Sequence, residues 1–207
     1  MCSWGFPSPS PPELPRSGEI PAALENAAVG DTPAAVSAPT PDWPAALFAA
    51  LLEADVRTVA YVPDAGHART IELAQAEPAI TAVPLTTEEE GIGYLAGAWL
   101  GGVRGVLLMQ SSGVGNCINT LALAAQARFP LLMLVTMRGE WAELNPWQNP
   151  AGGAAEESLK LMGVRTWRAD RSEDVEPLVR GALAMTFAGD MSSALLLGQR
   201  LIGSKTW

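Results

Sequence analysis

The chain has 207 residues with 13 basic and 22 acidic side chains, which gives it a formal net charge of −9. An excess of carboxylates repels phosphate groups, so this charge argues against a nucleic-acid surface and against an anionic membrane as partner. We expect a cytoplasmic protein, because its two cysteines, Cys2 and Cys117, show neither a disulfide framework nor a metal-ligand spacing.

Residues 1–41 are crowded with Pro, Ser and Ala and follow neither a helical nor a strand period. Such a segment buries too little apolar surface to fold, so we expect a disordered leader here. It lacks the basic start and continuous apolar run of a secretory signal. We therefore predict one folded domain over residues 42–207, whose apolar runs are far shorter than the roughly 20 residues that span a bilayer.

Folded patterning begins at Asp42, a residue type that favours helix N-caps, and an apolar helical face follows it. A strand over 59–62 then ends in a Pro-Asp-Ala-Gly turn, directly before His67. A single histidine after a turn is usually a solvated or helix-start residue. A role for His67 therefore needs an argument beyond its position.

A helix over 68–76 and a strand over 80–85 lead into residues 86–120, which hold most of the functional signal. Thr86 and Thr87 precede three glutamates, and the threonine-to-glutamate spacing fits a capping box at a helix start. We expect a helix, a strand, a Gly-rich turn and a second helix in immediate succession.

Three consecutive glutamates, residues 88–90, open the first of these helices. The simpler interpretation is that carboxylates in a first turn complement the helix macrodipole. Glu89 is followed at plus three, four and seven by apolar or small residues, so we expect its side chain to be shielded from water and suited to proton exchange with a ligand. Glu88 also leads into an apolar line, so periodicity alone does not choose between the two.

The same helix carries small residues, including Gly93 and Gly97, that form a narrow stripe where another backbone can approach closely. A strand over 106–110 follows, and Gly-rich residues 111–115 are predicted to turn the chain into a helix that begins near Asn116. In a strand, turn and helix of this order, backbone N–H groups become available to a ligand.

A further strand over 131–136 is apolar throughout, as expected for a strand that is buried on both faces. Arg138 follows its carboxyl end, where open parallel sheets bind their ligands. We consider two interpretations of Arg138 equally: a cation for an anionic substrate, or an ion pair with Glu140 or Glu143.

Residues 141–153 are rich in Trp, Asn, Pro and Gly, and a loop of this length favours a functional or interface role. Helices over 156–162 and 174–187 and strands over 164–168 and 194–197 complete the pattern. Alternating strands and helices predict an α/β fold, a three-layer, doubly wound, mostly parallel six-stranded sheet with helices on both faces.

Four motifs, EEEGIGYLAGAW, LLMQSSGVGNCIN, PLLMLVTMRG and EWAELNPWQ, together resemble the pyrimidine-binding (N-terminal) domain of thiamine diphosphate-dependent decarboxylases. The resemblance spans about residues 43–198 and is strongest to sulfopyruvate decarboxylase α subunits and to the N-terminal half of phosphonopyruvate decarboxylases. In that family a glutamate contacts N1′ of the aminopyrimidine ring. Counting back from Ala98 and Trp99 places this role at Glu89, with Glu88 as the alternative one register away.

The resemblance also implies cofactor contacts in the Gly-rich segment, at Ser112, Gly113, Gly115 and Asn116. The Pro-Asp turn corresponds to a Val-Pro-Asp-Ser segment over the active site, although Ala65 here replaces the serine. The residues that the resemblance and strand-end position together suggest on the substrate side are Asp64, His67, Arg138 and Gln148.

The diphosphate and its Mg²⁺ require a Gly-Asp-Gly motif with a later Asn, which this sequence lacks; Gly189 and Asp190 are followed by Met191. The resemblance therefore implies that a separate diphosphate-binding β subunit holds Mg²⁺, in a hetero-oligomer whose pyrimidine-binding domains pair. The implied substrate is a 2-oxo acid, sulfopyruvate or phosphonopyruvate. Two alternatives stay open: a carboligase resembling acetolactate synthase, and a non-catalytic interaction module of the same fold.

Overall fold

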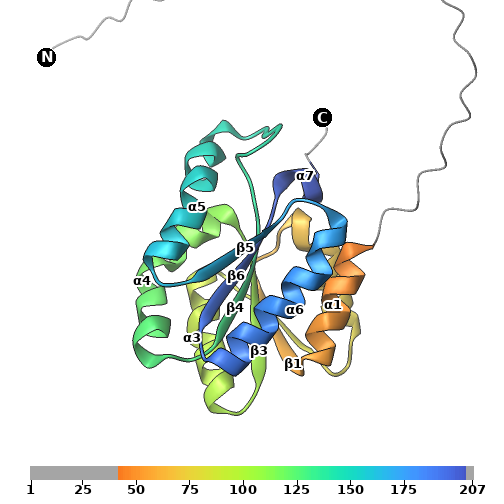
Figure 1. Ribbon diagram of the computed structural model, residues 1–207, viewed down its shortest axis with the longest axis vertical. Helices are drawn as coiled ribbons and strands as arrows, with labels where there is room; N and C mark the ends of the chain where they lie inside the picture. Colours follow the sequence, from red (N-terminus) through yellow and green to blue (C-terminus); the bar gives the residue numbers. More distant parts are fainter. Residues whose placement is uncertain (1–41, 204–207) are drawn as a thin grey trace, which may run out of the picture. The chain divides into compact units, whose positions relative to one another are not determined.

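The computed structural model describes residues 42–203, in which strands and helices alternate along the chain (Figure 1). The strands are β1 (Val56–Tyr61), β2 (Thr81–Pro84), β3 (Arg104–Gln110), β4 (Leu131–Thr136), β5 (Arg165–Ala169) and β6 (Ser192–Leu197). The helices are α1 (Trp43–Glu53), α2 (Ala68–Ala76), α3 (Glu88–Leu100), α4 (Ser111–Ala127), α5 (Asn149–Leu161), α6 (Ser172–Gly189) and α7 (Gln199–Ile202), with 3-10 turns η1 (Ala65–His67) and η2 (Pro146–Gln148). The leader predicted for residues 1–41 lies outside the described part.

The six strands form one sheet in the order β2-β1-β3-β4-β6-β5, and every neighbouring pair is parallel. Helices α1, α2 and α6 pack on one face over a core that includes Leu47 and Leu108. Helices α3, α4 and α5 pack on the other face over Ile92 and Met133. The predicted three-layer, doubly wound fold is confirmed, with a sheet that is parallel throughout the described residues.

Several predicted boundaries agree closely with the structure. The Asp42 side chain caps α1 by accepting a hydrogen bond from the Ala45 N–H at 3.2 Å. Thr87 and Glu90 form the predicted capping box of α3. Helix α2 and strand β4 have the predicted bounds, and all six residues of β4 are buried between β3 and β6.

Two predicted helix starts differ most from the structure. Helix α4 begins at Ser111, directly after β3, so residues 111–115 are the first turn of a helix and no separate Gly-rich turn precedes it. Helix α5 begins at Asn149 where the sequence predicts a loop to residue 153. Glycines lower helix propensity in both segments, but packing of α4 and α5 against each other overrides that preference.

The strand order places a topological switch point between β1 and β3. From β1 the chain passes to β2 on one side and then to β3 on the other side. In open parallel sheets, ligands bind in the crevice at the carboxyl ends of strands that diverge in this way. A ligand site is therefore expected at the residues just after β1, β3 and β4.

None of the helices between Trp43 and Ile202 has the length and apolar character that crossing a membrane requires.

The packing of β3 predicts a stability difference between two glycine variants. A Cβ added at Gly105 would overlap Leu95 and lie 2.5 Å from Thr58 Cγ2, whereas one added at Gly181 on α6 meets nothing within 4 Å. We expect Gly105→Ala to lower the free energy of unfolding by about 1–3 kcal/mol because the core is overpacked. Gly181→Ala should raise it by up to about 1 kcal/mol through helix propensity. Urea unfolding measures both, and equal effects would contradict the packing described.

Candidate functional site

Three turns at the switch point bring polar side chains to one edge of the sheet. Asp64 follows β1, Ser111 follows β3, and Arg138 follows β4. Because β1, β3 and β4 are neighbours and parallel, their carboxyl ends share one edge. The site is built on this edge and on the start of α3, which enters it after β2.

Glu88, the first residue of α3, is buried against the first turn of α4. Its carboxylate accepts a hydrogen bond from Asn116 Nδ2 at 2.7 Å. A Cβ added at Gly113 would overlap the Glu88 carboxyl group, so only glycine admits Glu88 here. Gly113 is therefore covered by its own chain, and its function is to let α3 and α4 approach each other.

Glu89 is exposed, so the prediction that this chain shields it from water is wrong. A helix turns by about 100° per residue, and the buried line of α3 runs from Glu88 through Ile92 to Leu95. Glu89 instead begins the line of Gly93 and Gly97, where an added Cβ would meet nothing within 4 Å. Both lines look apolar in the sequence, so only packing decides which one faces the core.

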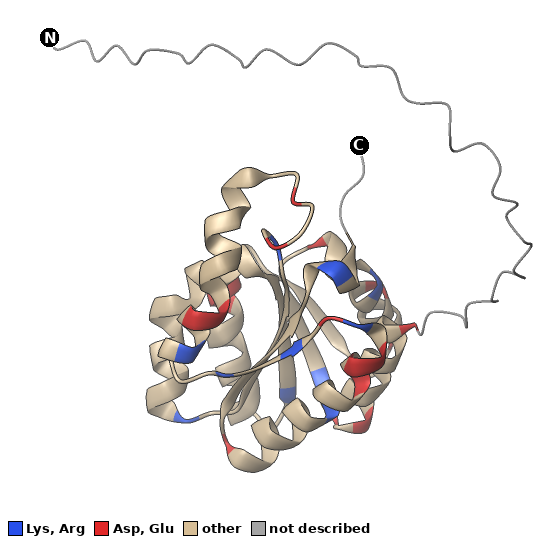
Figure 2. Ribbon diagram, turned by 45° about the horizontal axis from the view of Figure 1, so that its top comes forward, with Lys and Arg blue, Asp and Glu red and all other residues tan. Residues whose placement is uncertain are grey.

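The glycine stripe of α3 lies beside an exposed helix face that carries no charge. Helix α4 packs against α3, and no Asp, Glu, Lys or Arg occurs between Ser111 and Ala127, as its uniform colour in Figure 2 shows. Solvent-facing helices normally carry charged residues on the outer side. The exposed residues of α4 include Gly115, Asn116, Asn119, Ala122 and Leu123. Ser112, predicted as a cofactor contact, is half-buried in the same first turn.

Burial and the nearby carboxylates make Cys117 unreactive. Burial in α4, followed by the charges of Glu88 and Glu89, raises the pKa of the Cys117 thiol to about 12. Both glutamates therefore lie near the start of α4, although only one of them is buried. This thiol remains protonated at neutral pH and takes no nucleophilic role.

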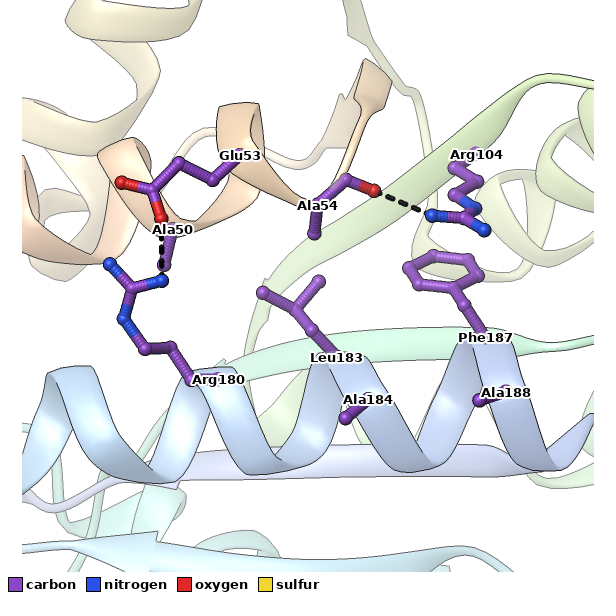
Figure 3. A pocket seen from close by; sticks show the side chains of 9 residues that line it. All are labelled: Ala50, Glu53, Ala54, Arg104, Arg180, Leu183, Ala184, Phe187 and Ala188. Carbon is purple, nitrogen blue, oxygen red and sulfur yellow. Dashed lines mark hydrogen bonds and ion pairs between the residues drawn. The ribbon is translucent and has the colours of Figure 1, made fainter.

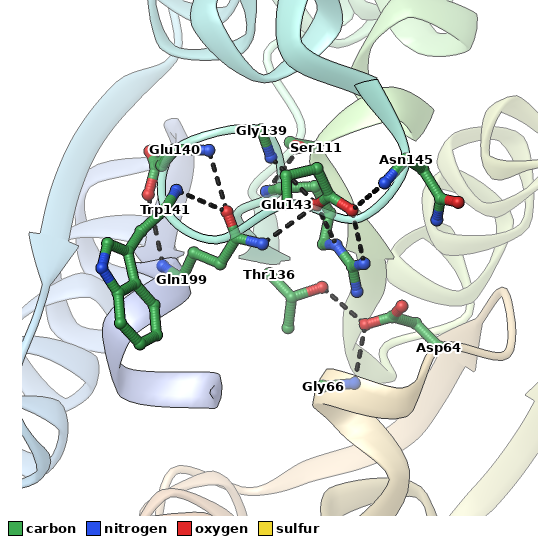
Figure 4. A network of polar contacts seen from close by, with 11 residues as sticks. Asp64, Gly66, Ser111, Thr136, Gly139, Glu140, Trp141, Glu143, Asn145 and Gln199 are labelled. Carbon is green, nitrogen blue, oxygen red and sulfur yellow. Dashed lines mark hydrogen bonds and ion pairs between the residues drawn. The ribbon is translucent and has the colours of Figure 1, made fainter. Parts of the chain in front are cut away.

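The Asp64 carboxylate is fixed over the end of β4 (Figure 4). It accepts hydrogen bonds from Thr136 Oγ1 at 2.7 Å and from the Gly66 N–H at 2.9 Å. The Asp64 side chain is half-buried, so it remains accessible at the switch point. Of the residues predicted on the substrate side, Asp64 is the one that stays both ordered and accessible.

His67 does not face a substrate, and this prediction is wrong. Its ring is fully buried, and Nε2 lies 3.2 Å from the Met109 carbonyl oxygen and 3.0 Å from the Leu134 carbonyl oxygen. Since carbonyl groups only accept hydrogen bonds, Nε2 carries the proton. Burial lowers the pKa of His67 although the Asp64 charge acts in the opposite direction. A neutral histidine that joins η1 to the ends of β3 and β4 is a structural residue.

Arg138 is held in a buried ion pair, so the prediction of a free cation for an anionic substrate is wrong. Its Nε and Nη2 atoms donate to Glu143 at 2.9 and 3.1 Å, and the two side chains are only 6% and 4% exposed. Hydrogen bonds to the Glu143 carboxylate raise the pKa of Arg138 above its ordinary value. The alternative interpretation of Arg138, an ion pair with Glu143, is the one found.

The Glu143 carboxylate is the centre of a larger network (Figure 4). Besides Arg138, it accepts hydrogen bonds from the N–H groups of Gly139 and Asn145 and from Gln199 Nε2 at 2.9 Å. The Arg138 hydrogen bonds, followed by these backbone donors, lower the pKa of Glu143 to about 2. Gln199 Oε1 in turn accepts from the N–H groups of Glu140 and Trp141.

Gln148, the fourth predicted substrate-side residue, is buried at the end of η2. Its Oε1 atom has no hydrogen-bond donor within residues 42–203. The structure therefore brings Asp64, Arg138 and the start of α4 together in one region. Gln148 and His67 are buried beneath it.

Sequence reasoning missed three polar residues that organise this edge: Thr136, Ser111 and Gln199. The Arg138 N–H donates to Ser111 Oγ at 3.0 Å, and Thr136 holds Asp64. Each of the three lies at or just after the carboxyl end of a strand. The rule that ligands gather at those ends could have identified all three.

Residues 43–158 match the family described as thiamine pyrophosphate enzyme, N-terminal TPP binding domain. The chain is similar to sulfopyruvate decarboxylase subunit alpha of Methanocaldococcus jannaschii, at 32% identity over 152 residues that cover 73% of this chain and 90% of that subunit. It is also similar to phosphonopyruvate decarboxylase of Streptomyces viridochromogenes, at 39% identity over 98 residues that cover 47% of this chain and 25% of that protein.

Among solved structures, the chain is similar to the 2-oxoglutarate:ferredoxin oxidoreductase from Magnetococcus marinus, with a TM-score of 0.60. The match has 13% sequence identity and covers 80% of this chain and 33% of that chain. At this identity the likeness concerns the fold alone.

Contacts in the first turn of α4 predict opposite effects for its two glycines. Gly113→Ala should lower the free energy of unfolding by about 1–3 kcal/mol, because the methyl group would displace Glu88. Gly115→Ala should leave it unchanged or raise it by up to about 1 kcal/mol, because the position is open and helical. Thermal and urea unfolding compare the pair. A stable Gly113→Ala protein would show that Glu88 is not held here.

The low pKa of Glu143 predicts a pH-dependent stability contribution. Because its pKa when folded is about 2, below the ordinary 4.5, the charge stabilises the fold above pH 4.5, and this contribution is lost as pH falls toward 2. Glu143→Gln should cost about 2–3 kcal/mol at pH 7, and the difference from wild type should shrink below pH 4.5.

The matched control is Glu157→Gln, since Glu157 is 72% exposed and forms a surface ion pair with Lys160 on α5. We expect this variant to change the free energy of unfolding by at most about 0.5 kcal/mol, both at pH 7 and below pH 4.5. Urea unfolding between pH 3 and pH 8 gives both profiles. A pH-independent cost of Glu143→Gln would contradict the ion pair.

Proposed function

Because the chain belongs to the family of thiamine pyrophosphate enzymes through their N-terminal TPP binding domain, we propose that it is the pyrimidine-binding α subunit of a 2-oxo acid decarboxylase. The proposed substrate carries a second acidic group, as sulfopyruvate and phosphonopyruvate do. The relative named sulfopyruvate decarboxylase subunit alpha supports this proposal, since the match extends over 90% of that subunit. The cofactor is thiamine diphosphate.

One observation carries the proposal: an exposed carboxylate, Glu89, stands beside an open glycine stripe and an uncharged helix face. A flat ring can approach Gly93 and Gly115, because an added Cβ at either position would meet nothing within 4 Å. Ser112 and Asn116 supply polar atoms in the adjoining first two turns of α4. The residues present therefore fit one side of an aminopyrimidine site.

Bound thiamine diphosphate supplies an electron sink for the carbon that loses carbon dioxide. In our proposal the Glu89 carboxyl group shares a proton with a nitrogen atom of the pyrimidine ring. This requires a dry environment, in which a carboxyl group favours its protonated form. Since its own chain leaves Glu89 exposed, a second chain has to cover it when the site is assembled.

The neighbouring Glu88 has a different task. Its carboxylate accepts a hydrogen bond from Asn116 and lies against Gly113, so it holds α3 against α4. Glu88 thus orients the helix start from which Glu89 projects. We propose Glu89 as the cofactor-contacting residue and a structural role for Glu88; Glu88 stays the alternative contact, because it is the shielded carboxylate of the two.

We propose that the partner is a diphosphate-binding β subunit that also holds Mg²⁺. Within residues 42–203 no group of three or more His, Cys, Asp or Glu side chains is arranged to hold a metal ion. The exposed stripe of α3 and the uncharged face of α4 offer the surface on which chains can assemble, with pairing of pyrimidine-binding domains as one expected contact. The second acidic group of the substrate then meets cations of the partner, because Arg138 is neutralised by Glu143.

Reconstitution tests the decarboxylase proposal. The full chain, co-purified with a diphosphate-binding subunit and supplied with thiamine diphosphate and Mg²⁺, should release carbon dioxide from sulfopyruvate or phosphonopyruvate and leave an aldehyde. A carbon–carbon ligation product would instead identify a carboligase, which the decarboxylase relatives do not favour. An assembled complex without turnover on any 2-oxo acid would support the non-catalytic alternative.

Two adjacent glutamine variants separate the roles of the glutamates. Glu89→Gln should lower turnover of the assembled enzyme by about 10²–10⁴-fold, the usual contribution of a proton-transferring group, while the free energy of unfolding changes by at most about 0.5 kcal/mol.

Glu88→Gln is the matched control. It keeps an acceptor oxygen for Asn116 and should retain most of the turnover. Steady-state kinetics and urea unfolding on both variants decide the matter. Loss of turnover in Glu88→Gln with full activity in Glu89→Gln would transfer the cofactor contact to Glu88.

A further inference from the structure

The turn after β4 is fixed by several hydrogen bonds to one carboxylate, that of Glu143. Glu143 accepts from Arg138 Nε and Nη2, from the N–H groups of Gly139 and Asn145, and from Gln199 Nε2. Five donors therefore converge on two oxygen atoms that are almost completely buried. Little of this carboxylate remains available to a substrate or to solvent.

Stability alone is a weak reason to bury such a pair. Removing two charges from water is costly, and apolar side chains of similar size often serve a fold equally well or better. The pair fixes the relative orientation of the two side chains, because the planar guanidinium group of Arg138 and the carboxylate of Glu143 form two hydrogen bonds in one bidentate geometry. A fold that retains this pair gains a fixed arrangement of the groups attached to it.

The attached groups are the carboxyl ends of four strands. The Arg138 N–H donates to Ser111 Oγ after β3, and Gln199 after β6 donates to Glu143. At the end of β4, Thr136 Oγ1 donates to the Asp64 carboxylate that follows β1. These hydrogen bonds connect the strand ends along the edge at which Asp64 and the first turn of α4 lie.

From these contacts we infer that Glu143 is a positioning residue of the active site. By holding Arg138 and Gln199, it fixes the ends of β3, β4 and β6 relative to one another, and so presents the first turn of α4 and Asp64 in a single geometry. Glu143 touches neither cofactor nor substrate. This role rests on the proposed function, in which that turn contacts the cofactor.

The test compares Glu143→Gln with Leu183→Ala in the full chain assembled with its diphosphate-binding subunit. Leu183 is buried in a groove between α1 and α6, near Arg104 at the amino end of β3 (Figure 3). Its truncation destabilises the fold far from the carboxyl edge and controls for stability loss alone. Both variants are assayed at a temperature at which unfolding curves show them folded.

We expect Glu143→Gln to lower kcat by about 10–100-fold, because small displacements of a positioned group have effects of this size, while KM changes by less than about threefold. Leu183→Ala should keep kcat within about threefold of wild type. Equal kcat values for Glu143→Gln and wild type, or equal losses in both variants, would overturn the inference.

Hydrogen exchange provides a readout that does not depend on turnover. In Glu143→Gln the amides of Glu140, Trp141 and Asn145 should exchange faster than in wild type, whereas Leu183→Ala should leave their rates unchanged. Unchanged exchange at these amides in Glu143→Gln would also overturn the inference. If the wild-type complex has no decarboxylase activity, the proposed function fails, but the exchange experiment still decides whether Glu143 fixes this edge.

Discussion

Parallel strand pairing is the constraint on which the rest of this structure depends. It places the carboxyl ends of all six strands at one edge. In the order β2-β1-β3-β4-β6-β5, the chain runs from β1 to β2 on one side and then to β3 on the other, which makes the switch point between β1 and β3. Side chains far apart in sequence, such as Asp64 and Arg138, are thereby brought together. The same edge receives the start of α3, so Glu88 and Glu89 lie beside the residues that follow β1 and β3.

Two adjacent glutamates have opposite environments because a helix turns by about 100° per residue. Glu88 lies between α3 and α4, in a space that exists only because residue 113 is glycine, and Glu89 stands on the open side. An exposed carboxylate is a poor proton-sharing group in water. The proposed role of Glu89 therefore requires another chain to cover it, and the relatives named as α subunits support such a partner.

At the carboxyl edge, the buried ion pair of Arg138 and Glu143 has a structural role. Arg138 suggests a substrate-binding cation in the sequence, yet the fold neutralises it with Glu143 and buries both. The accessible carboxylates near the carboxyl ends of β1 and β2 include Asp64 and Glu89. In the proposed function, Arg138 is therefore not free to bind an anionic substrate, and that task falls to other cations.

The sequence by itself determined the fold class, the strand count and the family, because apolar periodicity, capping residues and the Gly-rich motif are local signals. It also located the capping box of α3 and the bounds of α2 and β4. Only the tertiary structure decided which glutamate is buried, that His67 lies inside, and that Arg138 pairs with Glu143. Those outcomes depend on contacts between distant segments, which periodicity along one helix or strand does not encode.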